Sequence, residues 1–259
     1  MIKVAIAGAG GKMGRALTEA VQADGSFTLA AALDAPASAA FGSVVGGVRV
    51  GSDIKAALSA ADLLIDFTRP EGTLAHLDAC VAAGKSMVIG TTGFSAGQLA
   101  RISDAAQRIP IVVSPNFAVG VNVVFRLAET AAKILGDAYD VEIIEAHHRH
   151  KVDAPSGTAL MLGKLVAGAL QWNLDEVASH GRQGDVGARP AKEIGFHAIR
   201  GGDIVGEHTV VFAGTGERVE IAVRSQSRMT YAQGALRAAR FLQGRKSGLY
   251  DMHDVLGLR

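Results

Sequence analysis

Short apolar runs alternate with segments of helical periodicity through the first 118 residues, and this alternation constrains the fold more than any other feature. Short, continuous apolar runs are typical of strands that are buried on both faces. Strands separated by helices pair in parallel, so the alternation predicts an α/β domain, a Rossmann-like parallel sheet covered by helices. The predicted strands are residues 2–7, 27–33, 63–67, 86–89 and 111–113, with helices starting near Met13 and at 74–83 and 98–107.

The pattern changes after Phe117, where helices and strands are separated by glycine-rich turns. Gly136 is expected to end a helix, because glycine commonly terminates helices. Turn sequences at 201–203 and 214–217 separate three strand patterns. The sequence therefore predicts a smaller α+β region with a mostly antiparallel sheet. Its elements are helices at 119–135 and 158–170, strands at 140–146, 194–200, 204–213 and 218–225, a loop at 180–195, and then a final helix at 231–242.

The composition is that of a folded globular protein, and it excludes several kinds of partner and site. Of the 259 residues, 49% are hydrophobic and 20% are charged, which argues against disorder. A formal net charge of +1 gives no support to nucleic-acid binding. The single cysteine, Cys80, excludes an internal disulfide and a zinc site of several thiolates, and it fits a reducing compartment. Prolines interrupt the longest uncharged stretch, residues 109–125, so we expect no membrane span and a cytoplasmic protein.

A glycine-rich turn follows the first predicted strand and opens the first helix. Glycines there let backbone N–H groups approach a pyrophosphate at the helix N-terminus. Asp34 ends the second strand, 20 residues after Gly14, where a carboxylate accepts hydrogen bonds from the adenosine ribose. These features together favour dinucleotide binding over a simple tight turn. The turn comprises Gly8, Ala9, Gly10, Gly11, Lys12 and Met13, and with Gly14 its spacing is G-x-x-G-x-x-G rather than the commoner G-x-G-x-x-G.

Asp34 also bears on the choice between NADH and NADPH. Its carboxylate repels the 2′-phosphate of NADPH, and the next residue, Ala35, offers no cation. We therefore expect NADH to bind at least as well as NADPH, although Lys12 and Arg15 leave NADPH open as a cofactor.

Loops rich in small polar residues follow three further predicted strands. Ligands of open α/β sheets bind at the carboxyl ends of the strands, so these loops are candidates for contacting the nicotinamide half of the cofactor. Thr91, Thr92 and Asn116 could reach the nicotinamide ribose or amide, and Phe117 could pack on the ring. The loops are residues 66–70, then Gly90, Thr91 and Thr92 followed by Gly93 and Phe94, and finally Ser114, Pro115, Asn116 and Phe117.

Three of the eight histidines fall in the run His147, His148, Arg149, His150 and Lys151. Metal binding is one interpretation, but adjacent histidines on a strand point to opposite faces and no further His or Cys spacing supports a site. A nucleic-acid patch lacks nearby aromatic residues, and a solvated basic turn is a third interpretation. We favour an anion site that also supplies a proton, because Lys151 is crowded by cations and should hold its proton less firmly.

A helix start follows this basic run. Ser156, Gly157 and Thr158 come directly after Pro155, and the N–H groups and hydroxyl of such a start suit a carboxylate. Together with the dinucleotide turn, this arrangement predicts an oxidoreductase that acts on a small acidic substrate.

Residues 146–159, which read AHHRHKVDAPSGTA, closely resemble the histidine motif of the dihydrodipicolinate reductase family of bacterial lysine biosynthesis. Residues 4–15, 90–93, 116–117 and 199–208 match the family as well, so the resemblance spans essentially the whole chain. It implies NADH- or NADPH-dependent reduction of a cyclic unsaturated dicarboxylate to tetrahydrodipicolinate, in the diaminopimelate route to lysine. It also implies a homotetramer joined through the sheets of the substrate domain.

The resemblance further implies roles for individual residues. His147 matches the family's proton donor and acceptor, Lys151 matches its proton donor, and His148, Gly157 and Thr158 match residues that hold a substrate carboxylate. The matches that line the cofactor are Gly8, Ala9, Gly10, Gly11, Lys12, Met13, Asp34, Gly90, Thr91, Thr92, Ser114, Pro115, Asn116 and Phe117. No metal is implied.

The domain boundaries expected from the resemblance follow from a final helix that returns to the first domain. They are 1–118 with 228–259 for dinucleotide binding, and 119–227 for substrate binding and oligomerisation.

The chain departs from the family at two places. Ala35 stands where NADPH-preferring members tend to carry Arg, and residues 222–225, AVRS, stand where the family often reads THRA.

Two other functions compete with this interpretation. A dehydrogenase of similar layout could work through a thiol, but Cys80 lies in an apolar helical stretch typical of an inert core residue. A non-catalytic NADH sensor is the alternative from a different class. The basic run beside a helix start argues against a sensor, because it suits the handling of a substrate.

Overall fold

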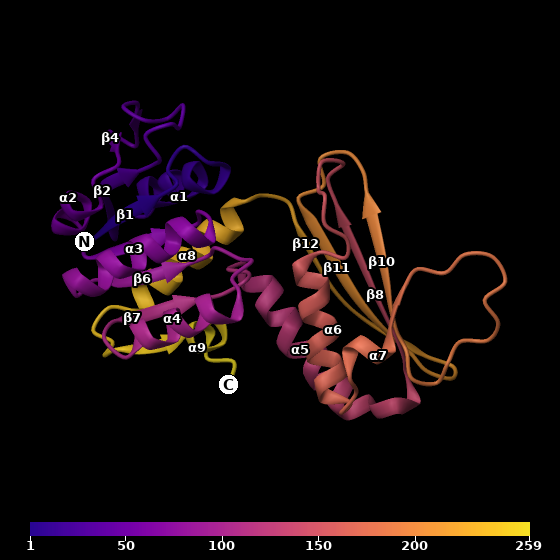
Figure 1. Cartoon of the computed structure of the whole chain (residues 1–259). Coiled ribbons are helices and arrows are strands. Elements are labelled where there is room, and N and C mark those ends of the chain that lie inside the picture. Colours follow the sequence, from indigo (N-terminus) through magenta and orange to yellow (C-terminus); the bar gives the residue numbers. More distant parts are fainter. The chain divides into compact units, whose positions relative to one another are not determined.

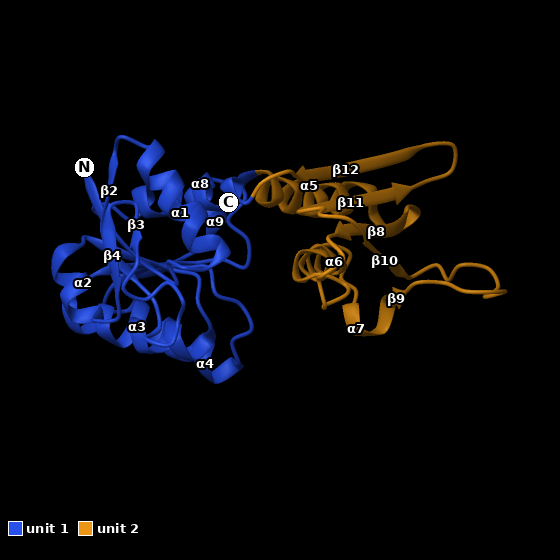
Figure 2. Ribbon diagram, turned by 90° about the horizontal axis from the view of Figure 1, so that it is seen from above, with its two compact units in different colours: residues 1–119, 228–259 blue, residues 120–227 orange.

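The computed structural model describes residues 1–259 and divides them into two compact units (Figure 2). The first unit combines residues 1–119 with 228–259, and the second comprises residues 120–227. The first unit is therefore built from two separate stretches of chain.

The first unit contains an eight-stranded sheet in the order β13-β7-β6-β5-β1-β2-β4-β3. All neighbouring strands pair in parallel except β3 with β4. The strands are β1 (Ile2–Ala7), β2 (Phe27–Leu33), β3 (Val44–Val45), β4 (Val48–Gly51), β5 (Leu63–Asp66), β6 (Ser86–Ile89), β7 (Pro110–Val113) and β13 (Gly248–Tyr250). The helices are α1 (Lys12–Ala23), α2 (Ile54–Ala60), α3 (Pro70–Ala83), α4 (Ala96–Ala106), α8 (Met229–Phe241) and α9 (Met252–Leu256).

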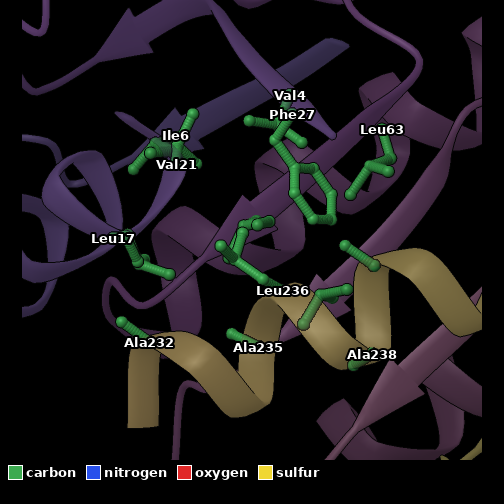
Figure 3. Close-up of a cluster of buried hydrophobic side chains, with 14 of the residues drawn as sticks. Val4, Ile6, Leu17, Val21, Phe27, Leu63, Ala232, Ala235, Leu236 and Ala238 are labelled. Carbon is green, nitrogen blue, oxygen red and sulfur yellow. The ribbon is translucent and has the colours of Figure 1, made fainter. Parts of the chain in front are cut away.

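Side chains on the two faces of this sheet enter two different cores, because successive strand residues point in opposite directions. Val4 and Ile6 pack with α1, α8 and α9 (Figure 3), whereas Ala5 and Ala7 pack with α2, α3 and α4. Both faces are covered, which explains why the strands are continuously apolar. The order of pairing reverses at β1, which has β2 on one side and β5 on the other, and such a point is where dinucleotides bind in this kind of sheet.

The second unit contains a five-stranded sheet in the order β12-β11-β8-β10-β9, with helices α5 and α6 along one face (Figure 1). Strand β11 pairs antiparallel with β12 and β8, while β10 pairs in parallel with β8 and β9. The antiparallel ladders form the larger part of the sheet. The elements are α5 (Val119–Leu135), a 3-10 turn (Gly136–Ala138), β8 (Asp140–His147), α6 (Gly157–Ala169), α7 (Leu174–Val177), β9 (Ala178–His180), β10 (Ile194–Arg200), β11 (Gly206–Ala213) and β12 (Arg218–Ser225).

The predicted elements are confirmed where a strong pattern exists, and several short ones were missed. The predicted bounds of β1, β2, β6, α5 and β12 agree with the structure. The parallel pairing of β10 was not predicted, and it arises because the crossover through α6 and α7 brings β10 back in the direction of β8. The short elements β3, β4, α2, α7, β9, β13 and α9 were also missed, since a few residues carry too little periodicity to be recognised.

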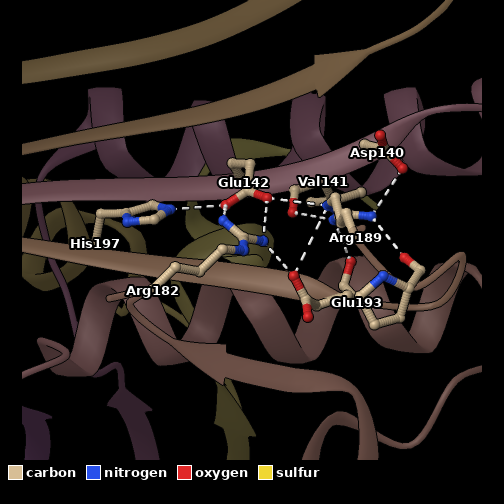
Figure 4. A network of polar contacts seen from close by, with 8 residues as sticks. Asp140, Val141, Glu142, Arg182, Arg189, Glu193 and His197 are labelled. Carbon is tan, nitrogen blue, oxygen red and sulfur yellow. Dashed lines mark hydrogen bonds and ion pairs between the residues drawn. The ribbon is translucent and has the colours of Figure 1, made fainter. Parts of the chain in front are cut away.

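An ionic network fixes the long loop of residues 181–193 to β8, the central strand of the second sheet (Figure 4). Glu142 of β8 accepts hydrogen bonds from Arg182 Nη2 at 2.7 Å, His197 Nε2 at 2.7 Å and Arg189 Nε at 3.1 Å. Burial alone would raise the pKa of Glu142, but these hydrogen bonds outweigh it and lower the pKa to about 2. The loop is therefore held by a carboxylate that must stay ionised.

We expect Glu142→Gln to lower the free energy of unfolding by about 1–3 kcal/mol at neutral pH, because three donors lose their ionised partner. The folded-state pKa is depressed, so this stabilisation is fully present above the ordinary glutamate pKa, near 4.5, and is lost as the pH falls toward 2. Denaturant unfolding at pH 7 and pH 3 measures both effects. The exposed Glu220→Gln is the control, and equal losses in the two variants would contradict the prediction.

Candidate functional site

The glycine-rich turn between β1 and α1 brings the helix start unusually close to the preceding strand. Gly8 has a φ of +73°, which an L side chain rarely adopts, and a Cβ on Gly14 would lie 2.2 Å from the carbonyl oxygen of Gly8. Gly11 caps α1 without a side-chain hydrogen bond, and the first turn contains no acidic residue. The positive end of the helix is thus available to an anion such as a pyrophosphate.

A cavity of about 850 Å³ lies beside this turn at the carboxyl ends of the strands in the first unit. Of the predicted cofactor residues, Gly8, Gly10, Gly11 and Asp34 line it. The other lining residues are Leu33, Ala35, Pro36, Ser38, Ser52, Phe67, Thr68, Arg69, Glu71, Gly72 and His76. Ala9, Lys12, Met13 and the predicted residues after β6 and β7 do not line this cavity.

Asp34 is held in place by the turn that it faces. Its carboxylate accepts hydrogen bonds from the backbone N–H of Gly10 at 2.9 Å and of Ala35 at 2.8 Å. A Cβ on Gly10 would lie 2.8 Å from the same carboxylate, so only glycine leaves room there. The carboxylate retains acceptor capacity for ribose hydroxyls, because each oxygen carries more than one lone pair.

The loops after β5 and β6 are tied together by one buried carboxylate. Asp66 is fully buried and accepts hydrogen bonds from Thr68 N at 2.9 Å and from His76 Nδ1 at 2.6 Å. Thr91 of the β6 loop joins the same group through Thr73, with 2.7 Å between their hydroxyl oxygens. Burial alone would raise the pKa of Asp66, but hydrogen bonds from His76 and Thr68 and the charge of His76 outweigh it and lower the pKa. Thr91 is therefore positioned by hydrogen bonding inside the protein.

The loop after β7 is organised by its own side chains. Ser114 Oγ donates to the carbonyl oxygen of Asn116 at 2.8 Å, and Asn116 Oδ1 accepts from the N–H of Ala118 at 2.9 Å. Phe117 is only 1% exposed and packs on Phe67, with 5.4 Å between ring centroids. The Phe117 ring thus belongs to the core.

A second cluster of polar residues lies on the helix-covered face of the other sheet, where β8 ends. Glu145 and His147 are two residues apart on β8 and share that face. Register places His208 of β11 opposite Glu145, and Arg200 of β10 opposite His147. His147 Nδ1 lies 2.6 Å from Glu145 Oε2, and the rings of His147 and His208 meet edge to face at 5.2 Å.

Burial controls the charge of the two histidines. It lowers the pKa of His147 despite the hydrogen bond and charge of Glu145, which act in the opposite direction. Burial, together with the charge of His147, lowers the pKa of His208 to about 4. His208 is therefore neutral at physiological pH, and its Nε2 lies 3.0 Å from Ser156 Oγ.

Lys151 and the start of α6 complete this cluster. The ammonium of Lys151 pairs with Asp153 Oδ1 at 2.8 Å, so a carboxylate partly offsets the crowding of cations that the sequence suggested. Ser156 caps α6 by accepting from the N–H of Ala159 at 3.2 Å, and Gly157 next to it is exposed. No acidic residue occupies the first turn, so the helix start favours an anion.

His148 lies beside this cluster in the loop that follows β8. Its Nδ1 is buried without a hydrogen-bond partner, which leaves it a candidate for contact with a ligand. Thr158 belongs to the first turn of α6. His147, His148, Lys151, Gly157 and Thr158 thus lie between the end of β8 and the first turn of α6, in the continuous segment of residues 147–158.

Three residues of this cluster, Glu145, Arg200 and His208, were not predicted from the sequence. The i, i+2 spacing of Glu145 and His147 on one strand was an available signal. Arg200 and His208 come from other strands, so only pairing reveals them.

Other chemistries find less support. Cys80 is fully buried, and burial followed by the charge of Asp66 raises its pKa to about 12, so its thiol is not a nucleophile. No group of three or more His, Cys, Asp or Glu side chains has the geometry to hold a metal ion. None of the helices combines the length and apolar character that crossing a bilayer requires.

Comparison with known proteins identifies the family. Models of the N-terminus and the C-terminus of dihydrodipicolinate reductase match residues 2–117 and 120–256. The 4-hydroxy-tetrahydrodipicolinate reductases of Cupriavidus metallidurans and Aromatoleum aromaticum are each 58% identical to this chain. Both alignments cover 100% of this chain, and they cover 100% of the first relative and 96% of the second.

Solved structures agree with this assignment. A dipicolinate-bound dihydrodipicolinate reductase from Paenisporosarcina sp. TG-14 superposes with a TM-score of 0.78 at 27% identity over 97% of each chain. A probable dehydrogenase from Thermotoga maritima shares the fold alone, with a TM-score of 0.63 at 9% identity over 99% of this chain and 93% of the other.

The fold and the matches define the class as an oxidoreductase with a dinucleotide-binding, Rossmann-type unit. The chain belongs to the dihydrodipicolinate reductase family.

We expect Gly14→Ala to lower the free energy of unfolding by about 1–3 kcal/mol, because the added methyl group overlaps the backbone of the turn. Gly97→Ala is the matched control, since it also lies in a helix and nothing lies within 4 Å of its Cβ position. That control should raise stability by about 0.5–1 kcal/mol. Chemical denaturation of both variants tests the pair, and similar stabilities would show that the turn is not closely packed.

Proposed function

We propose that this protein catalyses the NADH- or NADPH-dependent reduction of 4-hydroxy-tetrahydrodipicolinate to tetrahydrodipicolinate, in the diaminopimelate route of lysine biosynthesis. The observation that carries the proposal is the cluster of His147, Lys151 and the start of α6, in a chain 58% identical over its full length to a curated reductase. A dinucleotide cavity in the first unit supports the same conclusion.

The substrate is a dicarboxylate, and the second unit offers charges and donors that suit one. The first turn of α6, with Gly157 and Thr158, provides backbone N–H groups at the positive end of a helix dipole. His148, whose Nδ1 has no partner within the protein, holds the same carboxylate. One solved relative has dipicolinate bound, and this supports a planar or near-planar dicarboxylate as the ligand class.

His147 and Lys151 carry the proton chemistry in this proposal. A bound nicotinamide supplies the hydride, and the reduced centre must gain a proton to avoid a high-energy anion. Lys151 donates that proton, because its ammonium carries N–H protons and a positive charge that attracts a dianionic substrate. His147 exchanges a proton through Nε2, the ring nitrogen that Glu145 leaves available.

In this proposal the cavity beside the glycine turn would hold the cofactor, the start of α1 would take its pyrophosphate, and Asp34 would accept from its adenosine ribose. The predicted contacts at Gly90, Thr91 and Thr92 and at Ser114, Pro115, Asn116 and Phe117 belong to its nicotinamide half. NADH serves at least as well as NADPH, because the lining residues that follow Asp34 in the chain are Ala35, Pro36 and Ser38, none of them cationic. The cation of the lining, Arg69, comes from the loop after β5.

The protein assembles as a homotetramer through the uncovered face of the second sheet. Ile144 of β8 and Ile199 of β10 are 36% and 53% exposed on that face, where a second sheet would bury them. Sedimentation analysis tests this, and a monomer at assay concentration would contradict it. A cytoplasmic location stays a prediction.

Steady-state oxidation of the reduced cofactor tests the activity, with substrate generated enzymatically from pyruvate and aspartate semialdehyde. Oxidation that depends on the generating enzyme supports the reductase. A protein that binds NADH but does not oxidise it, whichever substrate is offered, would instead favour the non-catalytic sensor.

We expect Lys151→Met to lower kcat by about 100-fold or more while leaving the Kd for NADH unchanged, since it removes the proton donor from the second unit only. Lys164→Met, an exposed lysine of α6, is the control. Rapid kinetics and NADH fluorescence measure the two quantities. Wild-type kcat in the Lys151 variant would overturn the donor role.

Cofactor preference has its own test. Ala35→Arg should raise kcat/KM for NADPH by about fivefold to tenfold, because a cation beside Asp34 attracts the 2′-phosphate, an interaction of about 1–1.4 kcal/mol. The exposed Ala39→Arg controls for added charge in the same loop. An unchanged ratio of NADPH to NADH efficiency would show that residue 35 does not face the ribose.

A further inference from the structure

Glu145 is the most completely bonded side chain of the cluster in the second unit, although no role was predicted for it. It is 1% exposed. Its Oε2 lies 2.6 Å from His147 Nδ1 and accepts from Arg200 Nη1 at 2.7 Å. Its Oε1 accepts from Arg200 Nη2 at 2.6 Å and from the backbone N–H of Ser156 at 3.1 Å. One carboxylate thus joins His147, the residue that caps α6, and a cation from β10.

This carboxylate is ionised in the folded protein. Burial alone would raise the pKa of Glu145, but hydrogen bonds from Arg200 and His147 and their charges outweigh it and lower the pKa. An ionised carboxylate can only accept hydrogen bonds. The ring proton of neutral His147 must therefore lie on Nδ1, which leaves the lone pair on Nε2.

We propose that Glu145 is a positioning residue that fixes the Nδ1–H tautomer of His147 and, through Ser156, anchors the start of α6 against the same group. The inference rests on the proposed function, in which His147 exchanges a proton and α6 holds a carboxylate. A single side chain then sets the geometry of proton transfer and of substrate binding together.

Arg200 and His208 support this role from the neighbouring strands. The bidentate ion pair with Arg200 holds the Glu145 carboxylate in one plane, and Arg200 Nη2 also donates to the carbonyl oxygen of Asp153 at 2.7 Å. His208, which register places opposite Glu145, packs its ring against His147 and meets Ser156 Oγ. His147 is thereby confined between two strands and the helix start.

Every charged group near His147 affects its titration. Glu145 raises its proton affinity, whereas Lys151 and Arg200 lower it. His208 is a neutral neighbour, and Asp153 lies against both Lys151 and Arg200. Removing the charge of Glu145 leaves Lys151 and Arg200 as the charged groups that act most on His147, so His147 should then protonate at lower pH.

The kinetic test is Glu145→Gln in the full-length enzyme. Arg200 Nη2 and the N–H of Ser156 both need an acceptor at the Oε1 position, whereas only Arg200 Nη1 must have one at Oε2, because His147 Nδ1 can itself become an acceptor. The amide oxygen therefore takes the Oε1 position, and the amide NH₂ faces His147 Nδ1 and drives the ring proton to Nε2. We expect kcat to fall about 100-fold, the KM for substrate to rise, the acidic limb of the kcat/KM profile to move to lower pH, and the Kd for NADH to stay constant.

Glu142→Gln is the matched control, because it removes an equally hydrogen-bonded carboxylate from the opposite face of the same strand. It should cost stability without lowering kcat or moving the pH profile. Equal effects of the two variants on kcat, or a Glu145 variant that changes KM alone, would reduce Glu145 to a structural residue and overturn the proposal.

A second measurement is independent of turnover. Two-bond nitrogen–proton correlation spectra of ¹⁵N-histidine-labelled protein distinguish the tautomers, and a His147→Asn variant assigns the signal among the eight histidines. We expect Nδ1–H in the wild type and Nε2–H in Glu145→Gln. An Nε2–H wild type overturns the positioning role even if the enzyme is active. A wild type with the expected tautomer but no activity refutes the proposed function instead.

Discussion

Each unit is organised around one buried carboxylate that is hydrogen-bonded to a histidine. Asp66 ends β5 and meets His76 Nδ1 at 2.6 Å, and Glu145 lies near the end of β8 and meets His147 Nδ1 at 2.6 Å. A buried charge is tolerated only when donors surround it, so each carboxylate gathers its loops about itself. Asp66 ties the β5 loop to α3 and the β6 loop, while Glu145 ties a strand end to a helix start. Both therefore shape the places where ligands are expected.

The two sheets set the context for these carboxylates in different ways. The parallel sheet has both faces covered, so polar groups gather where its strands end, and the glycine turn and Asp34 lie at that edge. The mixed sheet has helices on one face only. Successive residues of β8 point to opposite faces, so its polar side chains lie alternately on the covered and the uncovered face. Glu145 and His147 lie on the covered face and form the candidate site, whereas Glu142 lies on the other and anchors a loop.

Prediction from the sequence succeeded where periodicity or local chemistry is strong. The strands of the first unit and the helix at 119–135 carry clear apolar patterns, and Gly136 ended that helix as expected. The parallel placement of β10 was missed, because local periodicity does not encode the direction in which a crossover returns. Phe117 was assigned to the cofactor from its position after a strand, yet its ring is buried against Phe67. Roles for His147, Lys151 and the cofactor residues stay predictions.

The sequence by itself determined the dinucleotide turn, the acid at the end of the second strand, the basic run and the helix start after it, because each depends on residues close together in the chain. The tertiary structure decided which distant residues meet. It placed Arg200 and His208 beside Glu145 through strand register, and it decided which residues of α8 pack on the first sheet. The physical reason is that backbone pairing and burial act between segments, so no local pattern records them.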